Sequence, residues 1–211
     1  MDTVVEEVDV GRWRLEIERP KDADALIDEA RFDECEFLPY WAELWPSGVA
    51  LARAVASRAL GGRTVLELGC GLGVPSITAA RAGARVFATD WAPEALRLVA
   101  ANAHRNGVVV RPLQVDWRAP DAIGDRRFDL VLAADVLYEE RNAAPLARLL
   151  GDIVARDGVA LVADPGRRHA ARFLALVAEG GWSRDTMAVE ELPRGGIHRL
   201  WRKRITIAAH R

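Results

Sequence analysis

Apolar and polar positions in the central part of the chain alternate between short apolar runs and longer amphipathic stretches. The short runs are rich in β-branched residues, as in strands buried on both faces. They predict strands at 64–68, 85–89, 108–115, 130–133 and 158–163. The intervening stretches place apolar residues at helical spacing. They predict helices at 46–59, 76–82, 93–106, 139–156 and 168–180, the fourth interrupted or bent near Pro145. Strands that alternate with helices indicate an α/β fold with a parallel sheet.

The pattern changes near the C-terminal end, where two long strands are predicted at 182–192 and 197–208. A tight Pro193-Arg194-Gly195-Gly196 connection joins them, so they must run antiparallel. We therefore expect one sheet of seven strands that is mostly parallel and has an antiparallel C-terminal strand. No repeat or long linker divides the chain, and we expect a single domain over residues 1–211.

Residues 1–38 precede this pattern and are expected to form an N-terminal extension to a core of residues 39–211. Polar and apolar residues alternate at 3–8 and 12–17 around Gly11, which predicts a β-hairpin. A short acidic helix is expected at 22–31. Two interpretations are open: the extension is a flap over a site, or it only packs against the core.

The segment from Thr64 to Asp90 reads as strand, glycine-rich turn, helix, strand and terminal carboxylate. Gly69, Gly71 and Gly73 follow the first strand at once, and Asp90 ends the second strand. Such a βαβ unit binds a ligand that contains a ribose, with the acid on the ribose hydroxyls. A glycine-rich turn without any ligand is the alternative.

The details of this turn favour S-adenosylmethionine over a dinucleotide. The glycine spacing is G-x-G-x-G rather than the G-x-G-x-x-G of dinucleotide sites. Glu67 lies within the strand, where a carboxylate would repel a pyrophosphate but suit an ammonium and a sulfonium group. We therefore expect S-adenosylmethionine as cofactor and S-adenosylhomocysteine as product, and a nicotinamide-dependent reductase is disfavoured.

A second unusual segment, Pro39-Tyr40-Trp41-Ala42-Glu43-Leu44-Trp45-Pro46-Ser47-Gly48, stands directly before a predicted helix. Pro46 suits the first helical position. The aromatic residues are expected to roof the cofactor and line an acceptor pocket, because aromatic faces attract amine or sulfonium cations. The alternative is a hydrophobic lid that takes no part in chemistry.

Polar and aromatic residues also follow the later strands, at the sheet edge where ligands of open α/β folds bind. Trp91 follows Asp90 directly and is placed to lie against an adenine. Asp116 and Trp117 follow the third strand, where a carboxylate accepts amino hydrogens of the base and an indole stacks on it.

Asp135 and Tyr138 follow the fourth strand and should face the methyl group. A carboxylate at such a position instead often caps the next helix.

Composition and charge limit the classes of partner and the cellular location that we expect. The net charge of −2 argues against general nucleic-acid binding. No apolar run is long enough for a membrane span, and the acidic N-terminus does not resemble a secretion signal. Two cysteines, Cys35 and Cys70, provide neither a metal cluster nor a disulfide framework. We expect a cytoplasmic protein without a metal and favour a monomer.

Together these motifs resemble methyltransferase family 16, whose members are largely protein-lysine N-methyltransferases. The resemblance rests on the Pro39–Gly48 segment, Leu66-Glu67-Leu68-Gly69-Cys70-Gly71-Leu72-Gly73, Asp90, Asp116-Trp117 and the Asp135-x-x-Tyr138 motif, and covers roughly residues 39–167. It implies a Rossmann-like, seven-stranded class I methyltransferase sheet. Asp164-Pro165-Gly166-Arg167 resembles the branch that methylates the β subunit of electron transfer flavoprotein. Trp117 is closer to the branch that methylates valosin-containing protein and chaperones.

The resemblance also implies residue roles. The residues at the methionine end of the cofactor are Glu67, Gly69, Gly71, Trp45 and Ala134. Asp90 contacts the ribose. The residues at the adenine are Trp91, Asp116 and Trp117. The catalytic, lysine-side residues are Asp135 and Tyr138, with Trp41 and Glu43 as further candidates.

We therefore expect an enzyme that transfers methyl groups from S-adenosylmethionine to lysine side chains of a protein substrate. In this hypothesis Asp135 accepts a hydrogen bond from the amine and aims it at the methyl group. A small-molecule N-methyltransferase is the first alternative, because the cofactor half of the site would be the same. A non-catalytic cofactor-binding scaffold is the second. A nucleobase amino group is disfavoured because the loop reads Asp135-Val136-Leu137-Tyr138 rather than Asn-Pro-Pro-Tyr or Asp-Pro-Pro-Tyr.

Overall fold

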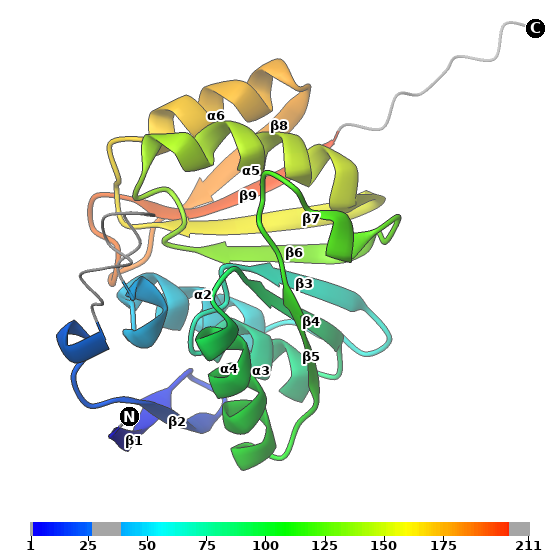
Figure 1. Cartoon of the computed structure of the whole chain (residues 1–211). Helices are drawn as coiled ribbons and strands as arrows, with labels where there is room; N and C mark the ends of the chain where they lie inside the picture. The colour runs from blue at the N-terminus through cyan, green and yellow to red at the C-terminus, as the bar shows by residue number, and fades with distance from the viewer. Residues whose placement is uncertain (1, 27–38, 203–211) are drawn as a thin grey trace, which may run out of the picture.

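A computed structural model describes residues 2–26 and 39–202 and shows a twisted sheet with helices on both faces (Figure 1). The sheet has seven strands in the order β5-β4-β3-β6-β7-β9-β8. In chain order the strands are β3 (Thr64–Leu68), β4 (Arg85–Asp90), β5 (Val110–Gln114), β6 (Phe128–Ala134), β7 (Val154–Asp164), β8 (Trp182–Met187) and β9 (Gly196–Arg202).

The pairing of these strands confirms the predicted fold class. All neighbours from β5 to β7 are parallel, whereas β9 is antiparallel to both β7 and β8. The last strand therefore enters between β7 and β8, and the chain order reverses between β3 and β6. In open α/β sheets a ligand crevice forms at such a reversal.

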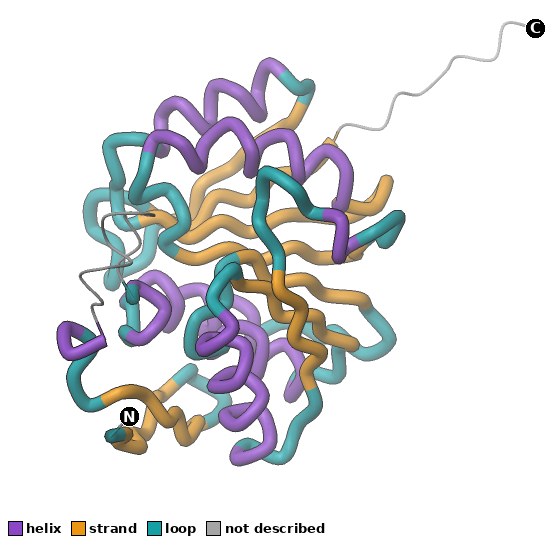
Figure 2. Tube along the Cα trace, viewed as in Figure 1, coloured by secondary structure: helices purple, strands orange, loops and turns teal. Residues whose placement is uncertain are grey.

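In the described part of the chain, five α-helices cover the sheet. The tube view shows helices on both sides of it (Figure 2). They are α2 (Pro46–Ala56), α3 (Val74–Arg81), α4 (Pro93–Arg105), α5 (Glu140–Ile153) and α6 (Ala170–Glu179). Helices α2, α3 and α4 pack on one face, and α5 and α6 on the other (Figure 1). Pro46 and Pro93 start α2 and α4, where a missing N–H costs nothing.

Alternation along the central strands builds the two core layers. In β3, Val65 packs with the α2–α4 layer and Leu66 with the α5–α6 layer. The same alternation separates Leu130 from Val131 in β6. Because both faces are covered, these strands are apolar almost throughout, which is why the sequence pattern located them.

Several predicted boundaries are wrong. The helix predicted to Arg156 ends at Ile153, and β7 already begins at Val154. Val154 pairs with Phe128 across an irregular register, so a bulge rather than a helix occupies the following residues. Helix α5 continues across Pro145 without interruption. Strand β8 ends at Met187, short of the predicted residue 192.

The N-terminal hairpin forms a separate two-stranded sheet of β1 (Thr3–Asp9) and β2 (Arg14–Pro20), which confirms the predicted hairpin. It packs against α4, where the Asn102 and Asn106 side chains each exchange hydrogen bonds with the β2 backbone. This contact favours the packing interpretation over a flap. Of the predicted helix at 22–31, a 3-10 turn over Asp24–Leu26 lies within the described residues and positions 27–31 lie outside them. Positions 203–208 of the last predicted strand, and Cys35, also lie outside.

No helix in the described part of the chain has the length and apolar character needed to cross a membrane.

Candidate functional site

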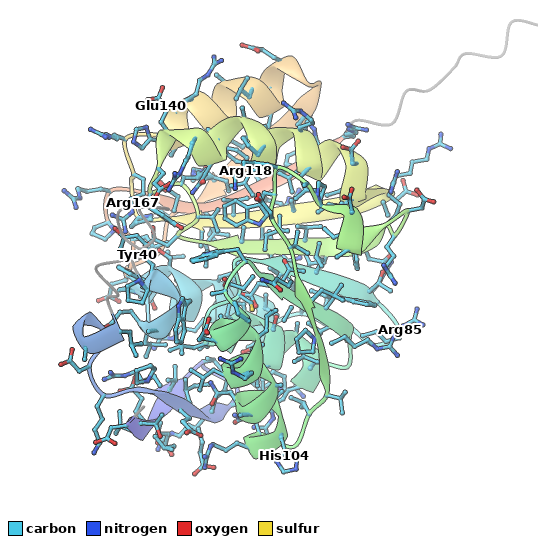
Figure 3. The ribbon with its side chains drawn as sticks, viewed as in Figure 1. Tyr40, Arg85, His104, Arg118, Glu140 and Arg167 are labelled. Carbon is cyan, nitrogen blue, oxygen red and sulfur yellow. The ribbon has the colours of Figure 1, made fainter. Side chains whose placement is uncertain are left out.

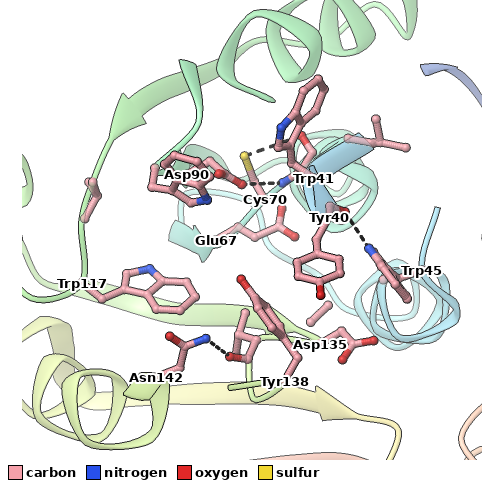
Figure 4. Close-up of a pocket in the computed structure, with 18 of the residues that line it drawn as sticks. Tyr40, Trp41, Trp45, Glu67, Cys70, Asp90, Trp117, Asp135, Tyr138 and Asn142 are labelled. Carbon is pink, nitrogen blue, oxygen red and sulfur yellow. Dashed lines mark hydrogen bonds between the residues drawn. The ribbon is translucent and has the colours of Figure 1, made fainter. Parts of the chain in front are cut away.

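A pocket of about 440 Å³ opens at the carboxyl ends of the central strands (Figure 4). It lies at the reversal of strand order between β3 and β6. All thirteen residues predicted for the site line it: Trp41, Glu43, Trp45, Glu67, Gly69, Gly71, Asp90, Trp91, Asp116, Trp117, Ala134, Asp135 and Tyr138. The structure therefore brings them together, and their individual roles remain predictions.

The glycine turn after β3 forms the floor of the pocket. Gly69, Gly71 and Gly73 all have positive φ angles, which side chains rarely adopt. A Cβ atom at Gly71 would lie 3.1 Å from the Trp41 carbonyl oxygen, and one at Gly73 would lie 2.2 Å from Val99 Cγ2. The turn thus needs glycine for its conformation and for the close approach of two other segments.

Glu67 is buried beneath this turn, with 1% of its surface exposed. Its Oε2 atom accepts hydrogen bonds from the backbone N–H and the hydroxyl group of Ser76, in the first turn of α3. Burial raises the pKa of Glu67 to about 8, because the charged form loses water and gains only these two donors.

Asp90 is the second buried carboxylate and ends β4. Its Oδ2 accepts the Gly71 N–H at 3.0 Å, and its Oδ1 accepts the Ala92 N–H at 3.0 Å. Burial raises the pKa of Asp90, and these hydrogen bonds oppose the rise. A carboxylate has about four acceptor positions, so those that the backbone N–H groups leave remain for a ligand diol.

Glu67 and Asp90 together suit a cationic ligand. Within residues 2–26 and 39–202 neither forms an ion pair. A cation at this place would stabilise the charged form of both buried carboxylates. The two carboxylates therefore fit a ligand that carries an ammonium group and a ribose.

Three residues predicted to bind adenine, Trp91, Asp116 and Trp117, also line the pocket. The Trp117 ring lies against Gly69, 3.2 Å from where a Cβ atom would stand. Trp91 is 40% exposed, and its carbonyl oxygen accepts a hydrogen bond from Gln114. Asp116 forms an ion pair with Arg118, and the hydrogen bond from this guanidinium lowers the pKa of Asp116. Two aromatic faces thus stand beside a carboxylate whose two oxygens both already accept hydrogen bonds from Arg118.

Asp135 has an unusual backbone at the end of β6. Among the described residues it is the single non-glycine residue with a positive φ, at 55°, and its N–H donates to the Ala163 carbonyl. The side chain is buried and forms a two-pronged ion pair with Arg167, with Nε–Oδ1 at 2.7 Å and Nη2–Oδ2 at 3.0 Å. It does not cap the next helix, because Glu139 occupies the N-cap position of α5.

Aromatic side chains stand around Asp135. The rings of Tyr40 and Tyr138 lie 4.9 Å apart, and those of Tyr40 and Trp45 lie 6.2 Å apart. Trp45 Nε1 donates to the Tyr40 carbonyl oxygen, which fixes the indole. Burial, and then the charge of Glu139, raise the pKa of Tyr138, so this phenol keeps its proton. The result is a mostly apolar channel with one buried carboxylate (Figure 4).

Trp41 and Glu43 lie differently within the pocket. The Trp41 backbone closes over Gly71, so this residue belongs to both the floor and the wall. Glu43 is an exposed residue at the rim, and its charge acts on Arg19 of the N-terminal hairpin.

Sequence reasoning expected Tyr40 at the pocket as part of the aromatic segment but gave it no role of its own, and it missed other lining residues, among them Arg118, Arg141 and Asn142. It also missed Arg167, which reaches Asp135 from the turn after β7 and lies near Tyr40 on one side of the molecule (Figure 3). The signal available in the sequence was position, because Arg167 follows a predicted strand and residues after parallel strands lie at one edge of a sheet.

Comparison with known proteins gives a family match for most of the chain. A family model described as lysine methyltransferase matches residues 40–179. This range holds every strand and helix that contributes to the pocket.

Two curated relatives are named for methyl transfer to different acceptors. An electron transfer flavoprotein beta subunit lysine methyltransferase of Danio rerio is 37% identical over 61% of this chain and 51% of its own length. A ubiquinone biosynthesis O-methyltransferase of a Methylobacterium species is 36% identical over 70% of this chain and 55% of its own length. The chain thus spans about half the length of the curated relatives it matches.

Among solved structures, the 16S rRNA N2 G1207 methyltransferase of T. thermophilus, in complex with S-adenosylmethionine and guanosine, has a TM-score of 0.69. It covers 95% of this chain and 51% of its own, at 16% identity. At that identity the likeness concerns the fold, which is that of the class I methyltransferases.

Proposed function

The chain belongs to the lysine methyltransferase family, and from this premise we propose that it is an S-adenosylmethionine-dependent N-methyltransferase of protein lysine side chains. One observation carries the proposal. A single pocket holds two buried carboxylates beside the glycine turn and a third carboxylate, Asp135, among aromatic rings. The first part suits the cofactor, and the second suits an amine.

The cofactor part divides into three contacts in the proposal. S-adenosylmethionine, when bound, supplies an electrophilic methyl group on a sulfonium. Glu67 and the turn at Gly69 and Gly71 would hold the methionine end, with Trp45 and Ala134 beside it. Asp90 would take the ribose hydroxyls with the acceptor positions that its backbone hydrogen bonds leave. Trp91, Asp116 and Trp117 would enclose the adenine.

The acceptor part must present an amine with a free lone pair in line with the methyl group. Methyl transfer to nitrogen needs alignment and the exclusion of water rather than covalent help from the protein. Asp135 accepts a hydrogen bond from the amine and orients it. Tyr40, Tyr138 and Trp45 form apolar walls that suit the aliphatic part of a lysine.

The proposed protein substrate follows from the relatives. Several are named lysine methyltransferases of the electron transfer flavoprotein beta subunit, at 34–37% identity over about 61% of this chain. The Asp164–Arg167 turn, which resembles the same branch, lies at the acceptor side. We therefore propose this flavoprotein subunit, or a protein like it, as the first substrate to test.

A small-molecule methyltransferase is the second candidate. The observation in its favour is the O-methyltransferase relative, which matches a larger share of this chain than the lysine methyltransferases do. A third candidate, a cofactor-binding scaffold without turnover, has no observation that favours it over the other two.

Further expectations from the sequence stay predictions. These are a location in the cytoplasm, a monomer, and no nucleic-acid or membrane partner.

The proposal is tested by incubating the purified protein with methyl-labelled S-adenosylmethionine and a cell lysate, then separating proteins from small molecules. We expect label in a protein band, stable to the mild base that cleaves methyl esters. The Asp135→Asn variant should give no band. Label that appears only in the small-molecule fraction would favour the second candidate.

A further inference from the structure

The guanidinium of Arg167 occupies one whole edge of the Asp135 carboxylate. Both carboxylate oxygens accept a hydrogen bond from it, at 2.7 and 3.0 Å. The Asp135 side chain is 6% exposed and that of Arg167 is 37% exposed. Fork-to-fork pairing of this kind fixes the plane of a carboxylate as well as its charge. The remaining acceptor positions of Asp135 belong to the edge away from the guanidinium.

The turn that carries Arg167 is itself held firmly. Asp164 Oδ2 accepts the N–H groups of Gly166, at 2.8 Å, and Arg167, at 3.1 Å. Gly166 has a φ of 94°, and a Cβ atom there would lie 2.7 Å from the Arg194 carbonyl oxygen. The turn is therefore packed into one conformation, which places its fourth residue, Arg167, against Asp135.

The aromatic wall supports the guanidinium from another direction. The Arg167 Cζ atom lies 5.8 Å from the centre of the Trp45 ring. Trp45 is fixed by its hydrogen bond to Tyr40, so the arginine rests on a rigid surface. Arg167 thus connects the loop after β6, the turn after β7 and the segment before α2.

We propose that Arg167 is a positioning residue for the methyl acceptor, which fixes the Asp135 carboxylate and offsets its charge so that the substrate amine binds in its neutral, reactive form. This inference rests on the proposed function, because it assigns a role toward the amine that the proposed function requires.

The physical reason is that Asp135 must orient the substrate amine without stabilising its protonated form. A lone buried carboxylate stabilises an ammonium ion beside it, and an ammonium ion has no lone pair to attack a methyl group. A carboxylate already paired with a guanidinium still accepts a hydrogen bond, but the pair has no net charge. It therefore orients the amine with much less preference for the protonated form.

Other charged or titratable groups near the pair do not replace Arg167. Asp164 adds negative charge, but its oxygens already accept backbone N–H groups. Tyr40 and Tyr138 face the same channel as phenols. Glu139 and Arg141, at the start of α5, form an ion pair with each other. Arg167 is therefore the cation in contact with Asp135.

Two substitutions separate charge from geometry. In Arg167→Gln the charge is lost, so kcat should fall about 10²-fold at neutral pH. The acid limb of its kcat profile should move up by about one pH unit or more, because the bound amine then holds its proton more strongly. In Arg167→Lys the charge stays but the two-pronged pairing is lost. Its kcat should fall while its acid limb stays within a few tenths of a pH unit of the wild type.

Arg168→Gln is the matched control, because it removes the adjacent exposed arginine, which does not line the pocket. It should behave as the wild type. The affinity for S-adenosylhomocysteine, measured by calorimetry, should stay within about threefold in all three variants. A reduced kcat in Arg167→Gln without a shift of the acid limb would overturn the inference, as would wild-type kcat in Arg167→Lys. If Arg167→Gln does not fold, the Arg167→Lys result decides.

The acceptor is established first with the wild type, so two kinds of failure are distinguishable. If the wild type methylates a small amine instead of a protein, the protein-lysine proposal fails, and the Arg167 variants are then measured with that amine. If the wild type methylates a protein lysine and the acid limb does not move, the role of Arg167 alone fails.

Discussion

At the scale of single residues, the site concentrates features that cost stability elsewhere in a protein. Glu67 and Asp90 are buried acids without an ion pair in the described chain, and Asp135 has a left-handed backbone. Such features persist where the surroundings impose them, which happens most often at functional sites. Here Ser76 donates to Glu67, Gly71 donates to Asp90, and Arg167 pairs with the side chain of Asp135.

Asp135→Asn tests the acceptor role with the least structural change, because asparagine tolerates a positive φ and has a similar shape. The amide lacks the negative charge that orients the amine and pairs with Arg167. We expect turnover to fall by at least about 10²-fold. The dissociation constant of S-adenosylhomocysteine, from calorimetry, should change less than about threefold. Turnover equal to that of the wild type would remove Asp135 from the acceptor site.

Glu67 predicts a pH dependence of stability in the cofactor-free protein. Its pKa is about 8 in the folded chain, against an ordinary value of 4.5. Between these values the folded state keeps a proton that the unfolded state has lost. The free energy of unfolding should therefore fall as pH rises from 4.5 to 8, by on the order of 1 kcal/mol per pH unit. Urea titrations across this range should show a smaller decline for Glu67→Gln.

The same carboxylate should couple cofactor binding to proton release. A cationic ligand favours the ionised form of Glu67, so the affinity for S-adenosylmethionine should rise with pH up to about 8. Calorimetry in buffers with different ionisation enthalpies measures the protons released. Equal release in the wild type and in Glu67→Gln would assign the proton to another group.

At the scale of elements, the glycine turn is supported from behind by the N-terminal hairpin and α4. Asn102 is fully buried in α4, and its Nδ2 donates to the carbonyl oxygens of Glu18, in β2, and Leu72, in the turn. Its Oδ1 accepts the Glu18 N–H. One side chain thus joins the hairpin, the helix and the cofactor turn.

Asn102→Ala should destabilise the protein by about 2–4 kcal/mol, because it leaves buried backbone groups without partners. Asn106→Ala is the matched control, since Asn106 makes similar bonds to Glu16 in a more exposed place and does not contact the turn. Its cost should be about 1 kcal/mol. Only Asn102→Ala should also weaken S-adenosylhomocysteine binding. Equal effects of both variants on S-adenosylhomocysteine binding would show that Asn102 does not support the cofactor turn in the way inferred here.

The sequence predicted the buried strands better than the elements at the margins. Strands β3, β4 and β6 are apolar on both faces, so composition alone located them. The start of β7 was missed because Val154 continues the helical spacing of α5 and only its pairing with Phe128 makes it a strand. The side of the core on which the hairpin packs depends on Asn102, whose partners are distant in sequence.

The same reasoning explains what was found and missed in the site. Residues that directly follow a strand were predicted, because parallel strands present their carboxyl ends at one edge. Arg167 was missed as a site residue because its role depends on which strand lies beside β6, a fact of sheet order. Tyr40 was expected at the pocket as part of the aromatic segment, but its contact with Tyr138 was not predicted, because the two residues lie nearly a hundred positions apart in the sequence.

At the scale of the whole molecule, the proposed function requires one pocket to hold two ligands, the cofactor and the methyl acceptor. In the proposal, the glycine turn and the ends of β3, β4 and β5 form the cofactor part, and the ends of β6 and β7 with the aromatic segment form the acceptor part. The first part is shared by methyltransferases of many substrates, whereas the second decides the acceptor. The central claim therefore concerns the acceptor part.

The most direct test of that claim is mass spectrometry of an electron transfer flavoprotein beta subunit after incubation with the purified protein and S-adenosylmethionine. We predict methyl groups on lysine side chains in the wild-type reaction and none in the Asp135→Asn reaction. An unmodified beta subunit, together with methyl transfer to a small-molecule acceptor in the lysate assay, would contradict the assignment of a protein lysine as the acceptor.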